Sequence, residues 1–103
     1  FIKPVVDWNY EQKRAKIESR RKLINDSRLI ISKSWKDIYV FRQTGEYLRL
    51  QEYFSEELQD IFNMDIFDYY YKVQNSHDDL NDEYRYLTLK EINSLSKKWG
   101  LEY

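Results

Sequence analysis

An apolar side chain recurs at every seventh position near the start of this 103-residue chain. Because an α-helix makes one turn in about 3.6 residues, this spacing places the side chains on one side of a helix. It predicts one long helix from about residue 7 to about residue 39. The stripe consists of Tyr10, Ile17, Ile24, Ile31 and Ile38, flanked by Leu23, Ile30 and Trp35.

Two features of this segment leave alternatives open. The tripeptide Asn25–Asp26–Ser27 competes with the helix for backbone hydrogen bonds, so one kinked helix and two shorter helices both satisfy the pattern. A heptad stripe is also typical of a self-associating coiled coil, which makes a homodimer the alternative. Leu23, Leu29 and Ile30 widen the stripe beyond a coiled-coil seam, and this favours packing inside one globular domain.

The composition favours a single all-α domain that covers residues 1–103. Two glycines and one proline argue against glycine-rich phosphate loops and turn-rich β architecture. The lack of cysteine excludes disulfide scaffolds, thiolate zinc sites and cysteine nucleophiles. The single histidine excludes most histidine-rich metal centres.

Two short helices are predicted in the middle of the chain from their N-cap residues. Thr44 is placed to cap one helix that runs through Tyr53, and Ser55 is placed to cap the next. Glu56 and Glu57 suit the positive N-terminus of that second helix. Its buried face is predicted to consist of Leu58, Ile61 and Phe62.

Residues 65–73 have strong β propensity, but they also fit the continuation of an amphipathic helix with Phe62, Ile66, Tyr69 and Val73 on one side. A lone strand would have no partner in a helical chain, so a helix is favoured. Residues 75–83 are polar and acidic and are predicted to form a loop.

The C-terminal segment contains the clearest helix signals. Thr88 and Glu91 predict a capping box, and Gly100 is placed to leave the helix in the left-handed conformation, with Leu101 folding back. The apolar stripe between them consists of Leu89, Ile92, Leu95 and Trp99. Together, these elements predict an all-α fold in which a long N-terminal helix packs with two to four shorter helices.

Charge is divided unevenly along the chain. Residues 1–49 carry 12 Lys/Arg and 6 Asp/Glu, whereas residues 50–103 carry 5 and 12. An apolar, aromatic run over residues 1–8 precedes clustered basic residues, which is typical of the cytoplasmic exit of a membrane helix. We therefore expect a transmembrane helix upstream, with basic side chains facing anionic inner-leaflet lipid or a partner. These residues are Lys13, Arg14, Lys16, Arg20, Arg21, Lys22 and Arg28.

The same basic stretch suits contacts with nucleic-acid phosphates. The sequence pI of about 5.9 and the acidic second half argue against such contacts. A nucleic-acid-binding regulator, for example of phage origin, is therefore the alternative function.

Candidate chemistry is limited to one loop. His77 stands beside Asp78 and Asp79, and a histidine next to carboxylates can bind a divalent cation or act as a base. The loop lacks the glycine and the regular acidic spacing of an EF-hand, and a solvated acidic loop is the simpler interpretation. We expect no catalytic residue, no metal site and no cofactor, and hence no enzymatic activity.

The ten tyrosines supply both core area and candidates for a protein interface. Stacking on nucleic-acid bases ranks below these two roles. The candidate interface residues are Tyr69, Tyr70, Tyr71, Tyr84 and Tyr86.

Three blocks of the sequence resemble a group of small bacterial membrane-anchored proteins. They start at Phe1-Ile2-Lys3-Pro4 (through Ile24), at Phe41-Arg42-Gln43-Thr44-Gly45 (through Leu58) and at Glu91-Ile92 (through Leu101). The resemblance does not extend to residues 64–87. It implies an upstream membrane helix followed by a cytosolic helical domain, and it transfers no catalytic residue. We therefore expect a non-enzymatic interaction domain at the cytoplasmic face of a bacterial membrane, with a protein partner that the sequence does not identify.

Overall fold

The computed structural model describes residues 3–34, 37–77 and 79–101, with side chains from residue 12 onwards. All secondary structure in these ranges is helical, which confirms the all-α prediction. The long first helix is followed by four shorter α-helices and two 3₁₀ segments. In chain order the elements are α1 (Lys3–Lys33), η1 (Ile38–Gln43), α2 (Gly45–Leu50), η2 (Gln51–Tyr53), α3 (Glu56–Asn63), α4 (Ile66–Gln74) and α5 (Leu80–Lys98).

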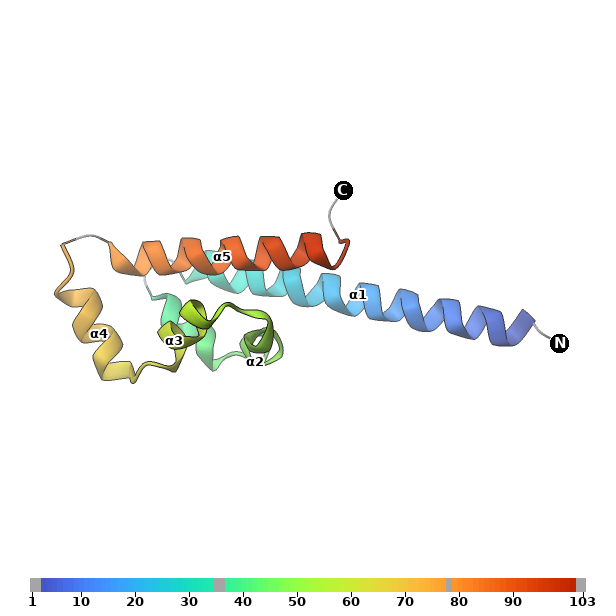
Figure 1. Ribbon diagram of the computed structural model, residues 1–103, viewed down its shortest axis with the longest axis horizontal. Helices are drawn as coiled ribbons and strands as arrows, with labels where there is room; N and C mark the ends of the chain where they lie inside the picture. The colour runs from blue at the N-terminus through green and yellow to red at the C-terminus, as the bar shows by residue number, and fades with distance from the viewer. Residues whose placement is uncertain (1–2, 35–36, 78, 102–103) are drawn as a thin grey trace.

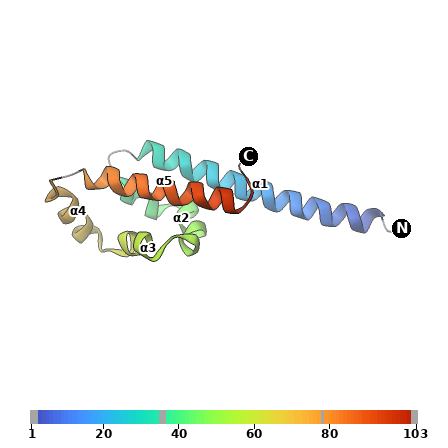
Figure 2. The same cartoon turned by 45° about the horizontal axis from the view of Figure 1, so that its top comes forward.

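The helices form an elongated molecule that measures 66 × 26 × 23 Å along its principal axes. Helix α5 runs antiparallel beside the second half of α1, and α4 lies at the end opposite the N-terminus (Figures 1 and 2). The first half of α1 extends beyond the other helices (Figure 1). We call residues 3–19 the stalk and the remaining described residues the body.

The heptad stripe is buried only within the body. Ile24, Ile31 and Ile38 are at most 1 % exposed, whereas Ile17 is 45 % exposed. Ile17 belongs to the stalk, which projects past the packed helices. The side chain of Tyr10, and Trp35, lie outside the described residues.

Helix α1 is continuous through Asn25–Asp26–Ser27, so the single-helix alternative is confirmed. Ser27 is fully buried, and Asp26 pairs with Lys22 at 3.4 Å within the same helix. The helix ends at Lys33 rather than at residue 39. Asp37 then caps η1 by accepting a hydrogen bond from the Tyr39 amide at 3.0 Å, which starts a new segment.

Three aromatic rings pack edge to face at the centre of the body. The ring centroids of Phe41 and Tyr47 are 5.8 Å apart, and Phe62 lies 6.0 Å from Phe41 and 5.1 Å from Tyr47. Such pairs add about 0.5–1.5 kcal/mol each beyond the burial of their area. They join η1, α2 and α3 into one core.

Both predicted N-caps in the middle of the chain are confirmed. Thr44 Oγ1 accepts a hydrogen bond from the Tyr47 amide at 3.2 Å, and Ser55 Oγ accepts one from the Leu58 amide at 3.3 Å. The predicted face of α3 is buried: Leu58, Ile61 and Phe62.

Residues 66–73 are helical, as favoured from the sequence, but they do not continue the helix that contains Phe62. Helix α4 is separate from α3 because Asp65 caps it, accepting a hydrogen bond from the Phe67 amide at 3.0 Å. The loop predicted over 75–83 is too long. Helix α5 begins at Leu80, because Asp79 caps it through the Asp82 amide at 3.1 Å.

The predicted Thr88–Glu91 capping box is wrong. Thr88 is fully buried inside α5, where its hydroxyl donates to the Tyr84 carbonyl at 2.8 Å. Glu91 instead reaches across to α3, accepting hydrogen bonds from the Ser55 amide at 2.6 Å and the Ser55 hydroxyl at 2.7 Å. A glutamate of α5 thus supports the cap of a helix 36 residues away in sequence.

The end of α5 agrees with the prediction. Gly100 has a φ of 73°, which is the left-handed conformation that favours glycine. The Leu101 amide donates to the Ser96 carbonyl at 3.0 Å, and the Leu101 side chain is buried. Leu101 therefore packs at the end of the body that adjoins the stalk.

Candidate functional site

The stalk is a helix that projects from the body, and most of its basic side chains lie in its second half and in the turn that follows. Residues 12–22 carry six Lys/Arg and one glutamate, and every side chain from residue 12 to residue 19 is exposed. Arg14 pairs with Glu18 at 3.2 Å, but both side chains are at least 60 % exposed. Such a pair contributes at most about 1 kcal/mol. Because most helical stability in proteins comes from packing, this segment gains little from the rest of the chain.

Two of the predicted basic residues have a different role. Arg20 lies 4.6 Å from the ring centroid of Trp99, and Arg28 donates to Asn93 Oδ1 at 2.7 Å and 3.0 Å. Both side chains are half-buried and attach α1 to α5. The basic surface therefore rests on Lys13, Arg14, Lys16, Arg21 and Lys22, which are exposed.

A shallow groove of about 450 Å³ surrounds Ile17 on the stalk. Its walls are Lys13, Arg14, Glu18 and Arg21. Along the stalk, the groove continues the face of α1 that α5 covers within the body. Two stalks placed against each other here would bring like charges together, which opposes the coiled-coil homodimer considered from the heptad stripe.

None of the helices in the described ranges has both the length and the apolar character needed to cross a membrane.

Two of the five candidate interface tyrosines are core residues. Tyr69 is 1 % exposed and Tyr84 is 7 % exposed, and their ring centroids lie 6.0 Å apart. Tyr69 also stacks against Tyr39 with a centroid distance of 4.7 Å. The prediction that Tyr69 and Tyr84 form an interface is wrong, because the phase of α4 and α5 turns both rings into the body.

The Tyr69 hydroxyl belongs to a buried polar cluster. Asn81, which is 5 % exposed, accepts hydrogen bonds at Oδ1 from the Tyr69 hydroxyl at 2.9 Å and from the Ile38 amide at 2.7 Å. One amide oxygen therefore links α4, α5 and the start of η1. Sequence reasoning missed this role, because nothing local to Asn81 indicates partners 12 and 43 residues away.

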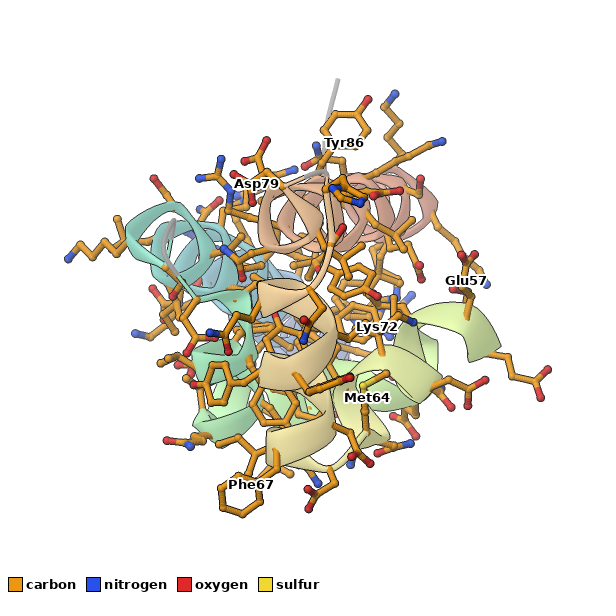
Figure 3. All side chains as sticks on the ribbon, turned by 90° about the vertical axis from the view of Figure 1, so that its left-hand side faces the viewer. Glu57, Met64, Phe67, Lys72, Asp79 and Tyr86 are labelled. Atoms are coloured by element: carbon orange, nitrogen blue, oxygen red, sulfur yellow. The ribbon has the colours of Figure 1, made fainter. Side chains whose placement is uncertain are left out.

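The remaining candidates are exposed, and two of them share a face with a phenylalanine. Phe67 is 79 % exposed, Tyr71 is 72 % exposed and Tyr70 is 43 % exposed. We call these three residues of α4 the aromatic face. In the view onto the α4 end, Phe67 points away from the body, and Tyr86, 69 % exposed, lies on the outer side of α5 (Figure 3).

Tyr70 is fixed by Asp37. Its hydroxyl donates to Asp37 Oδ2, and this bond, with partial burial, raises the pKa of Tyr70 to about 12. Burial, aided by the charge of Asp37, also raises the pKa of Tyr69. Burial likewise raises the pKa of Tyr47, against the opposing charge of Arg42.

These shifts predict the stability of the protein at alkaline pH. Unfolded tyrosines ionise near pH 10, whereas these three stay neutral in the folded state to higher pH. The unfolded state therefore releases protons first, so the contribution of these three tyrosines to the free energy of unfolding is fully present well below pH 10 and falls as pH rises towards 12. Urea unfolding over this range, followed with tyrosinate absorbance, measures the fall.

The variant Asp37→Asn is the matched test of this assignment. Asparagine keeps an oxygen to cap η1 but removes the charge beside Tyr70. The pKa of Tyr70 should move back towards 10, and the alkaline loss of stability should become smaller. An unchanged alkaline profile in this variant would contradict the role of Asp37.

A second groove, of about 600 Å³, lies between η2 and α5. Tyr53, Phe54, Leu87 and Leu95 supply its apolar surface, and Glu91 lines it while holding Ser55. The Ser55 hydroxyl already donates to Glu91 and accepts from the Leu58 amide. This arrangement is that of a helix cap.

His77 is exposed, and its neighbour Asp78 lies outside the described residues. Among the residues with a described placement, no three His, Asp, Glu or Cys side chains gather as metal ligands would.

Comparison of the chain with protein-family models, with curated proteins and with solved structures finds no match. The resemblance to bacterial membrane-anchored proteins therefore stays a prediction.

Proposed function

We propose that this chain is a non-enzymatic interaction domain held at the inner face of a bacterial membrane, with the stalk nearest the lipid. The observation that carries the proposal is the basic segment of α1 over residues 12–22, towards one end of a 66 Å molecule. Basic side chains next to a membrane each gain about 1 kcal/mol from the anionic leaflet.

The orientation follows from the placement of charge. The stalk and the first turn after it, residues 3–22, carry seven Lys/Arg and three Asp/Glu, a net charge of +4, and residues 12–22 within them carry a net charge of +5. Residues 50–103 carry a net charge of −7 and form most of the body. An anionic surface therefore attracts the stalk end and repels the opposite end. The aromatic face then points away from the membrane, where a partner protein can reach it.

The second half of the stalk and the turn after it do not suit a helix lying in the membrane plane. A helix in the plane needs a broad apolar face, but residues 12–22 contain only Ala15 and Ile17 as apolar side chains. Basic side chains flank Ile17 on both sides in the groove. Such a helix suits the charged layer that follows a transmembrane segment.

The experiment measures sedimentation of the chain with vesicles of phosphatidylglycerol and phosphatidylcholine in equal parts. Binding is expected, and pure phosphatidylcholine vesicles should bind at least ten times more weakly. Reversing Lys13, Arg14 and Lys16 to glutamate should lower the partition into anionic vesicles at least about 100-fold, since three favourable charges are lost.

The matched control reverses Arg49, Lys72 and Lys90, which are exposed on the body. Both triple variants change the formal net charge from −1 to −7, so an effect of net charge alone would be equal in the two. The proposal requires the stalk variant to lose at least ten times more affinity than the control. Equal losses, or no binding by the parent chain, would contradict it.

Nucleic acid is the second candidate, and the shape of the molecule favours it more than the sequence does. Charges in solution are screened within about 8 Å at physiological salt. The acidic end of a 66 Å molecule therefore does not repel a duplex bound along the stalk. Duplex DNA added to the same assay distinguishes the two, because tighter binding to DNA than to anionic vesicles at equal salt would replace the membrane proposal.

A further inference from the structure

The aromatic face lies at the end of the body farthest from the stalk (Figure 1). Phe67 and Tyr71 are four residues apart on α4, so their rings lie on the same side of the helix. They are 79 % and 72 % exposed. Neighbouring aromatic rings left in water to this extent mark an interaction surface.

A groove borders the aromatic face. It lies between α4 and the start of α5, has a volume of about 660 Å³ and includes Tyr71 in its wall. Met64 and Leu80 line it with half-buried apolar side chains, and Asp68 and Lys72 belong to its rim. The surface is therefore a row of exposed rings beside a hollow that is partly lined by apolar side chains.

One ring of the face is held in place before any partner binds. The Tyr70 hydroxyl donates to Asp37, and its ring lies 5.6 Å from Tyr69 and 6.5 Å from Tyr39, centroid to centroid. A fixed ring loses little conformational entropy on binding.

The charge around the face selects the chemistry of the partner. Residues 64–85 carry six acidic side chains and two basic ones, Lys72 and Arg85, and Arg85 pairs with Asp82. Asp65 and Asp68, both exposed, stand on either side of Phe67 along the chain. Aromatic rings attract arginine and lysine through their faces, and nearby carboxylates strengthen this attraction. The same carboxylates repel nucleic acid and anionic lipid.

We propose that the aromatic face binds a basic amphipathic segment of a partner protein, with arginine side chains over Phe67 and Tyr71 and an apolar side chain in the groove. The choice of another protein rests on the proposed function. Copies held by their stalks in one membrane keep each aromatic face away from each stalk, so the basic segment does not come from a neighbouring copy.

The test uses fluorescence anisotropy with a labelled synthetic helix that carries arginine on one face and leucine on the other. A second peptide with glutamate in place of arginine is the control ligand. The parent chain should bind the arginine peptide at least ten times more tightly than the glutamate peptide. Phe67→Ser and Tyr71→Ser should each weaken binding about 5–10-fold, and Asp68→Lys should weaken it by a similar factor.

Tyr86→Ser is the matched control variant, because Tyr86 is equally exposed but lies on α5. It should keep the affinity within about twofold. All four substitutions are at exposed positions, so each variant should fold, which circular dichroism checks.

Failure of the parent chain to bind the arginine peptide would overturn this inference, as would equal binding of the glutamate peptide. Unchanged affinity in both Phe67→Ser and Tyr71→Ser would overturn it too. The vesicle assay separates this inference from the proposed function. A parent chain that binds anionic vesicles but not the arginine peptide rejects this inference and leaves the proposed function standing, whereas a parent chain that binds the peptide but not the vesicles does the reverse.

Discussion

Replacing Asn81 with leucine is expected to lower the free energy of unfolding by about 2–5 kcal/mol. The substitution removes one oxygen that accepts hydrogen bonds from both the Tyr69 hydroxyl and the Ile38 amide. Each donor left buried without an acceptor costs about 1–3 kcal/mol. Urea unfolding of the variant and the parent measures the difference.

Asn93→Leu is the matched control, since Asn93 is also in α5 but is exposed and accepts its hydrogen bonds from Arg28. The Asn93→Leu substitution should lower the free energy of unfolding by about 1 kcal/mol or less. A second substitution, Tyr69→Phe, tests the mechanism. It should destabilise the parent chain. In the Asn81→Leu variant it should leave stability unchanged or slightly raised, because it removes the Tyr69 hydroxyl that has lost its acceptor. If the loss of stability in the double variant equalled the sum of the losses in the two single variants, the hydrogen bond between Tyr69 and Asn81 would not contribute as described.

Ile31→Ala is expected to destabilise the chain by about 2–5 kcal/mol, whereas Ile17→Ala should change stability by about 0.5 kcal/mol or less. Both residues belong to the same heptad stripe of α1. Ile31 is 0 % exposed, so truncation leaves a cavity in the core; Ile17 is 45 % exposed and lies on the stalk. Chemical denaturation of the two variants measures the contrast, and equal costs would show that the stalk packs as the body does.

Three helix ends were predicted correctly from signals that act within one turn of the helix. Thr44, Ser55 and Gly100 each stabilise a helix end through the adjacent backbone, so the residue type and its neighbours carry the information. The Thr88–Glu91 pattern has the same local form and misled the prediction. Glu91 finds its partner at Ser55, and α5 starts earlier because its first turns are capped by Asp79.

The candidate site was predicted less completely than the fold. Three consecutive tyrosines differ in exposure only through helix phase, and the spacing of Ile66, Tyr69 and Val73 already indicated that Tyr69 faces inward. Phe67 was missed as a surface residue, because an apolar residue type by itself predicts burial. The role of Arg20 against Trp99 depends on where α5 ends beside α1, which no local pattern encodes.

The proposed attachment of this chain to a membrane by its stalk end can be tested in cells. The most direct test expresses the product of the complete gene with its native N-terminus and fractionates the cells, washing the membranes with high salt and then with carbonate. The protein should stay in the membrane pellet through both washes. Recovery in the soluble fraction before any wash would contradict it, and the basic stalk would then have to serve nucleic acid or a soluble acidic partner.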